Sequence, residues 1–117
     1  MMMEYKELHE VNDWDQAWEG SVKKPILLFK HSTTCPISAG AFQQYKTYLE
    51  TADQDINCYL VKVIEDRPVS NQIAEVTGVK HESPQLFLIQ EKKVLWNTSH
   101  SDISVKSIDD AVQSVAP

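Results

Sequence analysis

Residues 25–31, PILLFKH, contain four consecutive large apolar side chains, and this run limits the possible folds more than any other feature of the chain. A strand with one face in water alternates apolar and polar residues, whereas an unbroken apolar run suits a strand covered on both faces, as in a parallel sheet. From Pro36 to about Leu49, apolar residues recur at helical spacing. The segment therefore predicts a buried strand, a short polar loop and a helix.

The same alternation continues further along the chain. INCYLVKV, residues 56–63, is rich in β-branched and apolar residues and predicts a second buried strand. Val69, Ile73 and Val76 then mark a helix, which we expect Gly78 to end. Two strands, each followed by a helix, indicate a parallel arrangement with helical crossovers.

The two ends of the chain complete this pattern. QLFLIQ (85–90) and VLWNTS (94–99) predict two short strands joined as a hairpin across residues 91–93. The last predicted helix carries an apolar stripe of Ile108, Ala111, Val112 and Val115. Near the start, the sequence predicts a short edge strand at Tyr5, Leu8 and Val11, then a helix capped by Asn12, bearing Trp14, Ala17 and Trp18, and ending at Gly20.

These elements predict an α/β fold with a central mixed sheet, in which a parallel βαβ half is joined to an antiparallel hairpin and helices cover both faces. The chain has 117 residues, of which 42% are apolar. That length suits one compact domain, and we expect residues 1–117 to form it.

Charge and targeting signals narrow the possible partners. Acidic residues outnumber basic ones by 17 to 11, which gives a net charge of -6 and argues against nucleic-acid binding and against an anchor on anionic membranes. The first ten residues are charged and lack the apolar run of a signal peptide, so we expect a cytoplasmic protein. A structural disulfide is disfavoured there.

Cys35 is the strongest candidate for a reactive group. The residue before a proline is displaced from helical angles and proline suits the first helical position, so Cys35-Pro36 places Cys35 at the helix N-cap. We expect the amides of Ile37 and Ser38 and the Ser38 hydroxyl to donate to its sulfur. Cysteines at helix N-termini have lowered pKa values, so the position predicts a nucleophile at neutral pH. A buried, inert cysteine is the alternative.

Cys58 is the contrasting case. It lies near the start of its predicted strand, about five residues, or on the order of 16 Å, from the edge that carries Cys35. A disulfide needs Cα atoms within about 7 Å, so we expect Cys58 to be structural and unable to form a bond with Cys35.

Other candidate residues leave alternatives open. Pro84 begins a predicted strand, where a trans proline is ordinary and a cis proline is possible. His81 is either a surface loop residue or a proton donor beside the thiolate. Two cysteines and four histidines show none of the usual metal-ligand spacings, so no metal site is expected.

The segments PILLFKHSTTCPIS, VIEDRPVSNQIAEVTGV and HESPQLFLI, with the hairpin that follows, resemble the thioredoxin superfamily over nearly the whole chain. TCPIS together with HESPQ is similar to the YtxJ-like monothiol bacilliredoxins. The resemblance implies a thioredoxin-like fold, a single active cysteine at Cys35 and a cis-proline at Pro84 beside it. It also implies bacillithiol as a co-substrate, with no bound cofactor. Glutaredoxins commonly carry a lysine at the position of Ser32, which argues against glutathione as the thiol.

The site residues expected on this basis fall into two groups. Ser38, Pro36, Ile37 and His81 are expected to support the Cys35 thiolate. Thr34, Ser83, Pro84 and Lys30 are expected to contact substrate.

A Cys-x-x-Ser site cannot release a bound partner by closing its own disulfide. Cys35 can instead attack a mixed disulfide between a protein and a small thiol, becoming S-thiolated until a second small thiol regenerates it. The expected activity is that of a monothiol thiol-disulfide oxidoreductase acting on S-thiolated cytosolic proteins. A redox sensor, or a non-catalytic adapter that binds proteins through the Pro84 loop, are the alternatives.

Overall fold

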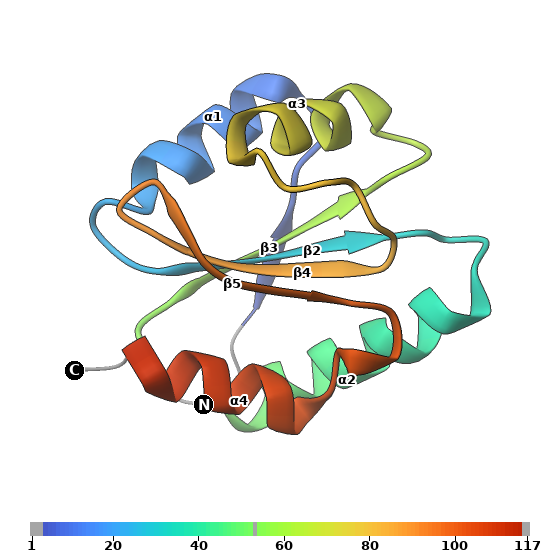
Figure 1. The fold of residues 1–117 in the computed structure, drawn as a ribbon, viewed down its shortest axis with the longest axis vertical. Coiled ribbons are helices and arrows are strands. Elements are labelled where there is room, and N and C mark those ends of the chain that lie inside the picture. Colours follow the sequence, from blue (N-terminus) through green and yellow to red (C-terminus); the bar gives the residue numbers. More distant parts are fainter. Residues whose placement is uncertain (1–3, 53, 116–117) are drawn as a thin grey trace.

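The computed structural model describes residues 4–52 and 54–115, which fold into a five-stranded sheet and four α-helices (Figure 1). The strands are β1 (Tyr5–Glu7), β2 (Ile26–His31), β3 (Asn57–Lys62), β4 (Gln85–Gln90) and β5 (Lys93–Ser99). The helices are α1 (Val11–Gly20), α2 (Pro36–Thr51), α3 (Arg67–Thr77) and α4 (Val105–Val115), with a short 3-10 helix, η1, at His100–Asp102. Among these described helices, none has the length and apolar character needed to span a membrane.

The sheet has the strand order β1-β3-β2-β4-β5, with β1, β3 and β2 parallel and β4 and β5 antiparallel. Figure 1 shows α1 and α3 on one face of the sheet and α2 and α4 on the other. The predicted mixed α/β fold, with its parallel half, its hairpin and its two helical layers, is therefore confirmed. All six residues of β2 are buried, as the apolar run at its centre predicts.

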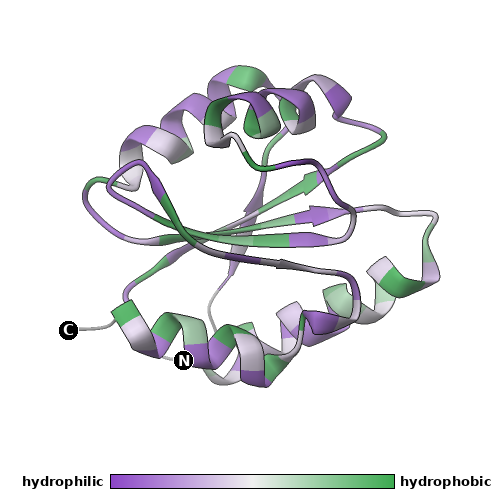
Figure 2. Cartoon of the chain, viewed as in Figure 1, coloured by the Kyte–Doolittle hydropathy of each residue, from purple (hydrophilic) through white to green (hydrophobic). Residues whose placement is uncertain are grey.

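Each face of the sheet has its own apolar core. Towards α2 and α4, side chains of β2 and β3 such as Leu27, Phe29 and Leu60 pack against Tyr45. Towards α1 and α3, the alternate strand residues pack against the helices; this second core includes Ile26, Leu28, Val61, Trp14 and Ile73. In Figure 2 the central strands are largely hydrophobic and the outer surfaces of the helices largely hydrophilic. The core thus fixes which way each β2 residue points.

The start of α1 differs from the prediction. Glu10, not Asn12, is the N-cap residue, and the helix begins at Val11. The Asp13 carboxylate accepts hydrogen bonds at 3.0 Å from the backbone amides of both His9 and Glu10, and these bonds lower the pKa of Asp13. Glu10 and Asp13 form a reciprocal capping box, which starts the helix at Val11 and leaves Asn12 inside the first turn.

Two turns follow the sequence closely. Gly78 ends α3 in the left-handed conformation, with φ of 70°. The β4–β5 hairpin forms without a glycine, because Glu91 and Lys92 both adopt positive φ, 53° and 58°. That pair of angles is typical of the tight hairpin turn that matches the twist of the strands.

The topology brings two distant loops to one edge of the sheet. β2 and β3 run parallel and end together, with His31 paired with Lys62. β4 runs the opposite way and begins where β2 ends, with Gln85 paired with Lys30. The loop after His31, which leads to Cys35, and the loop before Gln85, which contains Pro84, therefore lie at the same edge.

Candidate active site

Cys35 is the N-cap residue of α2, with extended backbone angles (φ -104°, ψ 122°) and Pro36 in the first helical turn. Its amide donates to the Ser32 carbonyl at 3.3 Å, which closes a tight turn, and its carbonyl accepts from the Ala39 amide at 3.0 Å. The side chain is partly exposed and is not in a disulfide. The sulfur is thus presented to solvent at the positive end of a helix of 16 residues.

The expected hydrogen bonds to the sulfur are absent from the described residues. The Cys35 side chain forms no capping hydrogen bond, so the Ile37 and Ser38 amides do not donate to it in this state. A neutral thiol is a weak acceptor, whereas these amides are of the kind that a thiolate would attract. Ile37 itself is 57% exposed beside the nucleophile.

The Ser38 hydroxyl was expected to donate to the Cys35 sulfur, but it binds the loop before Cys35 instead. Its side chain is fully buried, and its hydroxyl oxygen accepts a hydrogen bond from the Ser32 amide at 2.9 Å. The same oxygen lies 2.8 Å from Nδ1 of His31. The hydroxyl is turned inward because these two groups occupy it, and among the described residues it has no bond to Cys35. Ser38 therefore ties the active-site loop to α2.

His31 was not among the expected site residues, although it is part of this cluster. Only 8% of its surface is exposed, and its ring packs against Phe42 with centroids 4.7 Å apart. Burial lowers the pKa of His31, while the nearby charge of Glu65 opposes that shift. The neutral imidazole can therefore accept the Ser38 hydroxyl proton at Nδ1 while that hydroxyl accepts from Ser32.

Lys30 lies on the opposite face of the sheet from His31. It is 0% exposed, points towards α3, and its ammonium is 5.9 Å from the centre of the Phe87 ring. Its Nζ lies 3.1 Å from Nδ1 of His81, which is also 3.5 Å from the Ser70 hydroxyl. Lys30 was expected to contact substrate, but its side chain is buried. Alternate residues of β2 point to opposite faces of the sheet, and Lys30 points into the second core.

His81 is likewise placed differently from the expectation. Its Nδ1 faces Lys30 and Ser70, and no hydrogen bond within the described residues joins it to Cys35. The ring belongs to the loop before β4 and is exposed. His81 thus borders the site from the α3 side, and the structure gives no contact through which it would support the thiolate.

Pro84 follows a cis peptide bond from Ser83, the isomer that the family resemblance implies. The Pro84 carbonyl accepts from the His100 amide at 3.0 Å, which links the loop to η1. The Ser83 hydroxyl is buried without a hydrogen bond to the described residues. Thr34 is exposed on the nucleophile's loop, 3.5 Å from the Ser32 hydroxyl. Contact of Thr34, Ser83 and Pro84 with substrate remains a prediction.

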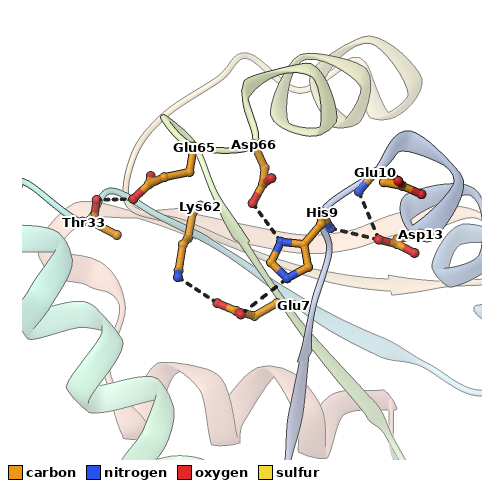
Figure 3. A network of polar contacts seen from close by, with 8 residues as sticks. All are labelled: Glu7, His9, Glu10, Asp13, Thr33, Lys62, Glu65 and Asp66. Carbon is orange, nitrogen blue, oxygen red and sulfur yellow. Dashed lines mark hydrogen bonds and ion pairs between the residues drawn. The ribbon is translucent and has the colours of Figure 1, made fainter.

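A polar network beside the loop was missed by the sequence analysis (Figure 3). The Thr33 hydroxyl donates to the Glu65 carboxylate at 2.8 Å, which ties the loop before Cys35 to the loop after β3. Nearby, Lys62 pairs with Glu7 at 3.2 Å. The network continues through His9, Asp66, Glu10 and Asp13. The pairing of residues 33 and 65 depends on β2 and β3 ending side by side, so no local pattern indicates it.

Cys58 lies in β3, paired with Leu27 at the far end of β2 from the active-site loop. It is buried, and burial raises the pKa of its thiol to about 12. Neither cysteine is in a disulfide, as expected. In the described part of the chain, no group of three or more His, Cys, Asp or Glu residues is arranged to hold a metal ion.

Comparison with known proteins gives the same architecture. The family model described as monothiol bacilliredoxin BrxC matches residues 6–108. A solved structure described as having a thioredoxin fold and a suggested oxidoreductase activity is 37% identical, with a TM-score of 0.83, and the match covers 92% of this chain and 93% of that one.

Thioredoxins of low sequence identity share the fold. The thioredoxin of Trypanosoma brucei brucei is 6% identical with a TM-score of 0.79, over 98% of this chain and 93% of the other. That of Fasciola hepatica is 9% identical with a TM-score of 0.75, over 93% and 97%. At these identities the likeness concerns the fold alone.

Proposed function

The chain belongs to the monothiol bacilliredoxin family, which has a thiol redox function, and from this premise we propose that it removes a small thiol from S-thiolated proteins through a mixed disulfide at Cys35. The observation that carries the proposal is the pair of positions 35 and 38. The first holds a partly exposed thiol at a helix N-terminus, and the second holds a buried, hydrogen-bonded hydroxyl.

The proposed reaction has two exchange steps. In the first, the Cys35 thiolate attacks the small-thiol sulfur of a mixed disulfide, a Cys35–small thiol bond forms, and the protein thiolate leaves and takes a proton from water. In the second, another small thiolate attacks the same small-thiol sulfur, and the oxidised small-thiol dimer leaves. Cys35 is restored, the protein thiol is freed, and one free small thiol is consumed as the disulfide bond passes from the protein to the small-thiol dimer, so electrons balance.

The local geometry supports the first step. The negative charge that forms on Cys35 would lie at the positive end of α2, where the Ile37 and Ser38 amides are able to turn a weak contact into charge-assisted hydrogen bonds. Ser38 supports the monothiol character, since a hydroxyl cannot form the second disulfide bond. The inward hydrogen bonds of Ser38 also hold the Cys35 loop against the helix.

The surroundings of Cys35 offer room for a protein partner. Ile37 is an exposed apolar side chain, and it lines a shallow groove of about 370 Å³ together with Ala41, His100 and Ile103. Because His100 also binds the Pro84 carbonyl, the groove adjoins the cis-proline loop. An exposed apolar residue at a groove next to the nucleophile favours a protein substrate that covers it.

Bacillithiol is the small thiol that we propose on the basis of family membership. Intact-mass spectrometry of reduced protein after brief exposure to bacillithiol disulfide or glutathione disulfide tests both the nucleophile and the thiol. We expect a rapid adduct with bacillithiol that Cys35→Ser abolishes and Cys58→Ala leaves unchanged. Equal, slow labelling by both reagents would instead favour the adapter.

Turnover separates the enzyme from the sensor. A bacillithiolated protein is incubated with a small amount of this protein and with excess bacillithiol, and release of the protein thiol is followed over time. We expect many substrate molecules to be released per Cys35, and Cys35→Ser to leave only the slow direct exchange with free bacillithiol. Adduct formation on Cys35 without repeated turnover would contradict the exchange reaction and support the sensor.

A further inference from the structure

The buried ammonium of Lys30 has no acidic partner within the described residues. Its hydrogen-bond partner is the imidazole of His81, and its remaining surroundings include the face of Phe87. A buried charge without a carboxylate is costly, and such groups concentrate where a function needs them. Lys30 is the residue before the last in β2, next to the active-site loop, and it pairs with Gln85, the residue after Pro84.

The contact between Lys30 and His81 fixes the imidazole tautomer. A lysine ammonium has only protons to give, so Nδ1 of a neutral His81 must be the acceptor and Nε2 must carry the proton. Burial, followed by the charge of Lys30, lowers the pKa of His81, which keeps the ring neutral at neutral pH. Among the described residues nothing binds Nε2, so the exposed ring has one free donor.

The charges around His81 favour an anion. Arg67, the first residue of α3, lies one helical turn before Ser70, whose hydroxyl is 3.5 Å from Nδ1 of His81. Beyond the effect of burial, the charge of Lys30 lowers the pKa of His81, Glu82 raises it, and Arg67 adds a smaller effect in the direction of Lys30. Glu82 is itself held 3.6 Å from His100, on the other side of the loop. The α3 side of the loop is therefore suited to a carboxylate. It offers the N–H of His81 and the guanidinium of Arg67, with the buried ammonium of Lys30 behind them.

We propose that His81, oriented by the buried Lys30 and assisted by Arg67, binds a carboxylate of the small thiol while that thiol is joined to Cys35. The proposal rests on the exchange reaction above and adds the substrate class, a thiol with a carboxylate. It also orients the substrate disulfide, with the small thiol on the α3 side of Pro84 and the protein on the side of Ile37 and His100. Lys30 acts as a positioning residue, since it reaches the thiol only through His81.

The test uses two small disulfides that differ only in charge, 3,3′-dithiodipropionate and its diamide. The rate of adduct formation on Cys35 is measured for each by intact mass, and the ratio of the two rates is the carboxylate preference. We expect His81→Ala, Lys30→Met and Arg67→Gln each to lower this preference by roughly threefold or more.

His100→Ala is the matched comparison, because His100 flanks the same loop on the other side. A preference that falls with His100→Ala and not with His81→Ala would overturn the proposed orientation. Equal preference in the wild type and in the His81 variant would overturn the carboxylate site itself. In both cases continued reaction of Cys35 with the diamide would leave the exchange reaction intact, whereas loss of reaction with both reagents would contradict the exchange reaction instead.

The tautomer has an independent readout. Long-range proton–nitrogen NMR spectra of the ring distinguish Nδ1–H from Nε2–H forms. We expect the Nε2–H form of His81 at pH 7.5 in the wild type and a mixture of both forms in Lys30→Met. An Nδ1–H form in the wild type would contradict the role of Lys30 whatever the kinetic result.

Discussion

Replacement of Lys30 by methionine should make the protein more stable, although it removes a hydrogen bond. Lys30 is fully buried, and burial lowers its pKa from the usual 10.5 to about 8. At about 1.36 kcal/mol per pH unit, this difference corresponds to about 3 kcal/mol by which the buried charge disfavours the folded state at neutral pH. Methionine fills a similar volume without a charge. We expect the free energy of unfolding to rise by about 1–3 kcal/mol at pH 7.

The pH dependence of this gain is the sharper part of the prediction. The unfolded chain binds the Lys30 proton up to pH 10.5, but the folded chain releases it near pH 8, so the wild type gains stability as pH rises between these values. Lys30→Met lacks this effect, and the gap between the two proteins should therefore shrink from pH 8 towards pH 10.

Urea unfolding at several pH values measures the gap, with Lys106→Met as the control. Lys106 is an exposed lysine paired with Asp110 on α4, and its removal should change the free energy of unfolding little at any of these pH values. A Lys30 variant that is less stable than the wild type, or a gap that does not change between pH 7.5 and 9.5, would refute the reasoning.

Three further predictions concern the residues around the nucleophile. Ser38→Ala should lower the free energy of unfolding by about 2–3 kcal/mol in urea because two buried partners lose their hydrogen bonds, whereas Thr47→Ala, in the same helix, should change it little. Ser38→Cys should convert small-thiol adducts on Cys35 into an intramolecular disulfide visible by mass; persistent adducts would contradict this. The lowered pKa values of His31 and His81 should decrease the melting temperature as pH falls below about 6.5, since the unfolded chain binds their protons first; a flat profile between pH 7 and 5 would contradict the lowered pKa values.

The order of elements was predictable because each signal is local. An unbroken apolar run, a Cys-Pro helix start and a glycine after a helix each depend on a few neighbouring residues, and the structure places β2, α2 and the end of α3 as they indicate. The cap of α1 was predicted wrongly because a capping box between Glu10 and Asp13 starts the helix before Asn12. Choosing between adjacent polar residues depends on small differences in free energy.

The placement of a site residue was predictable where it depends on a helix start that the local sequence marks. It was not predictable where it depends on which face of the sheet the side chain lies on and on what packs there. Cys35 follows from the helix start alone. Lys30 and His31 are neighbours in β2, and only the packing of α2 and α3 decides that one joins His81 and the other joins Ser38. The contact between Thr33 and Glu65 depends in the same way on two strands that end together.

The inward direction of Ser38 did have a signal in the sequence. Ser38 lies on the same helical stripe as the buried residues Ala41, Tyr45 and Tyr48, so a polar side chain there needs partners inside the protein. A cysteine in its place would form weaker hydrogen bonds, so the Ser32 amide and the His31 ring would each be left with a weaker partner. The monothiol site is therefore more than a dithiol site with one sulfur missing, because its serine hydroxyl holds together the loop that presents Cys35.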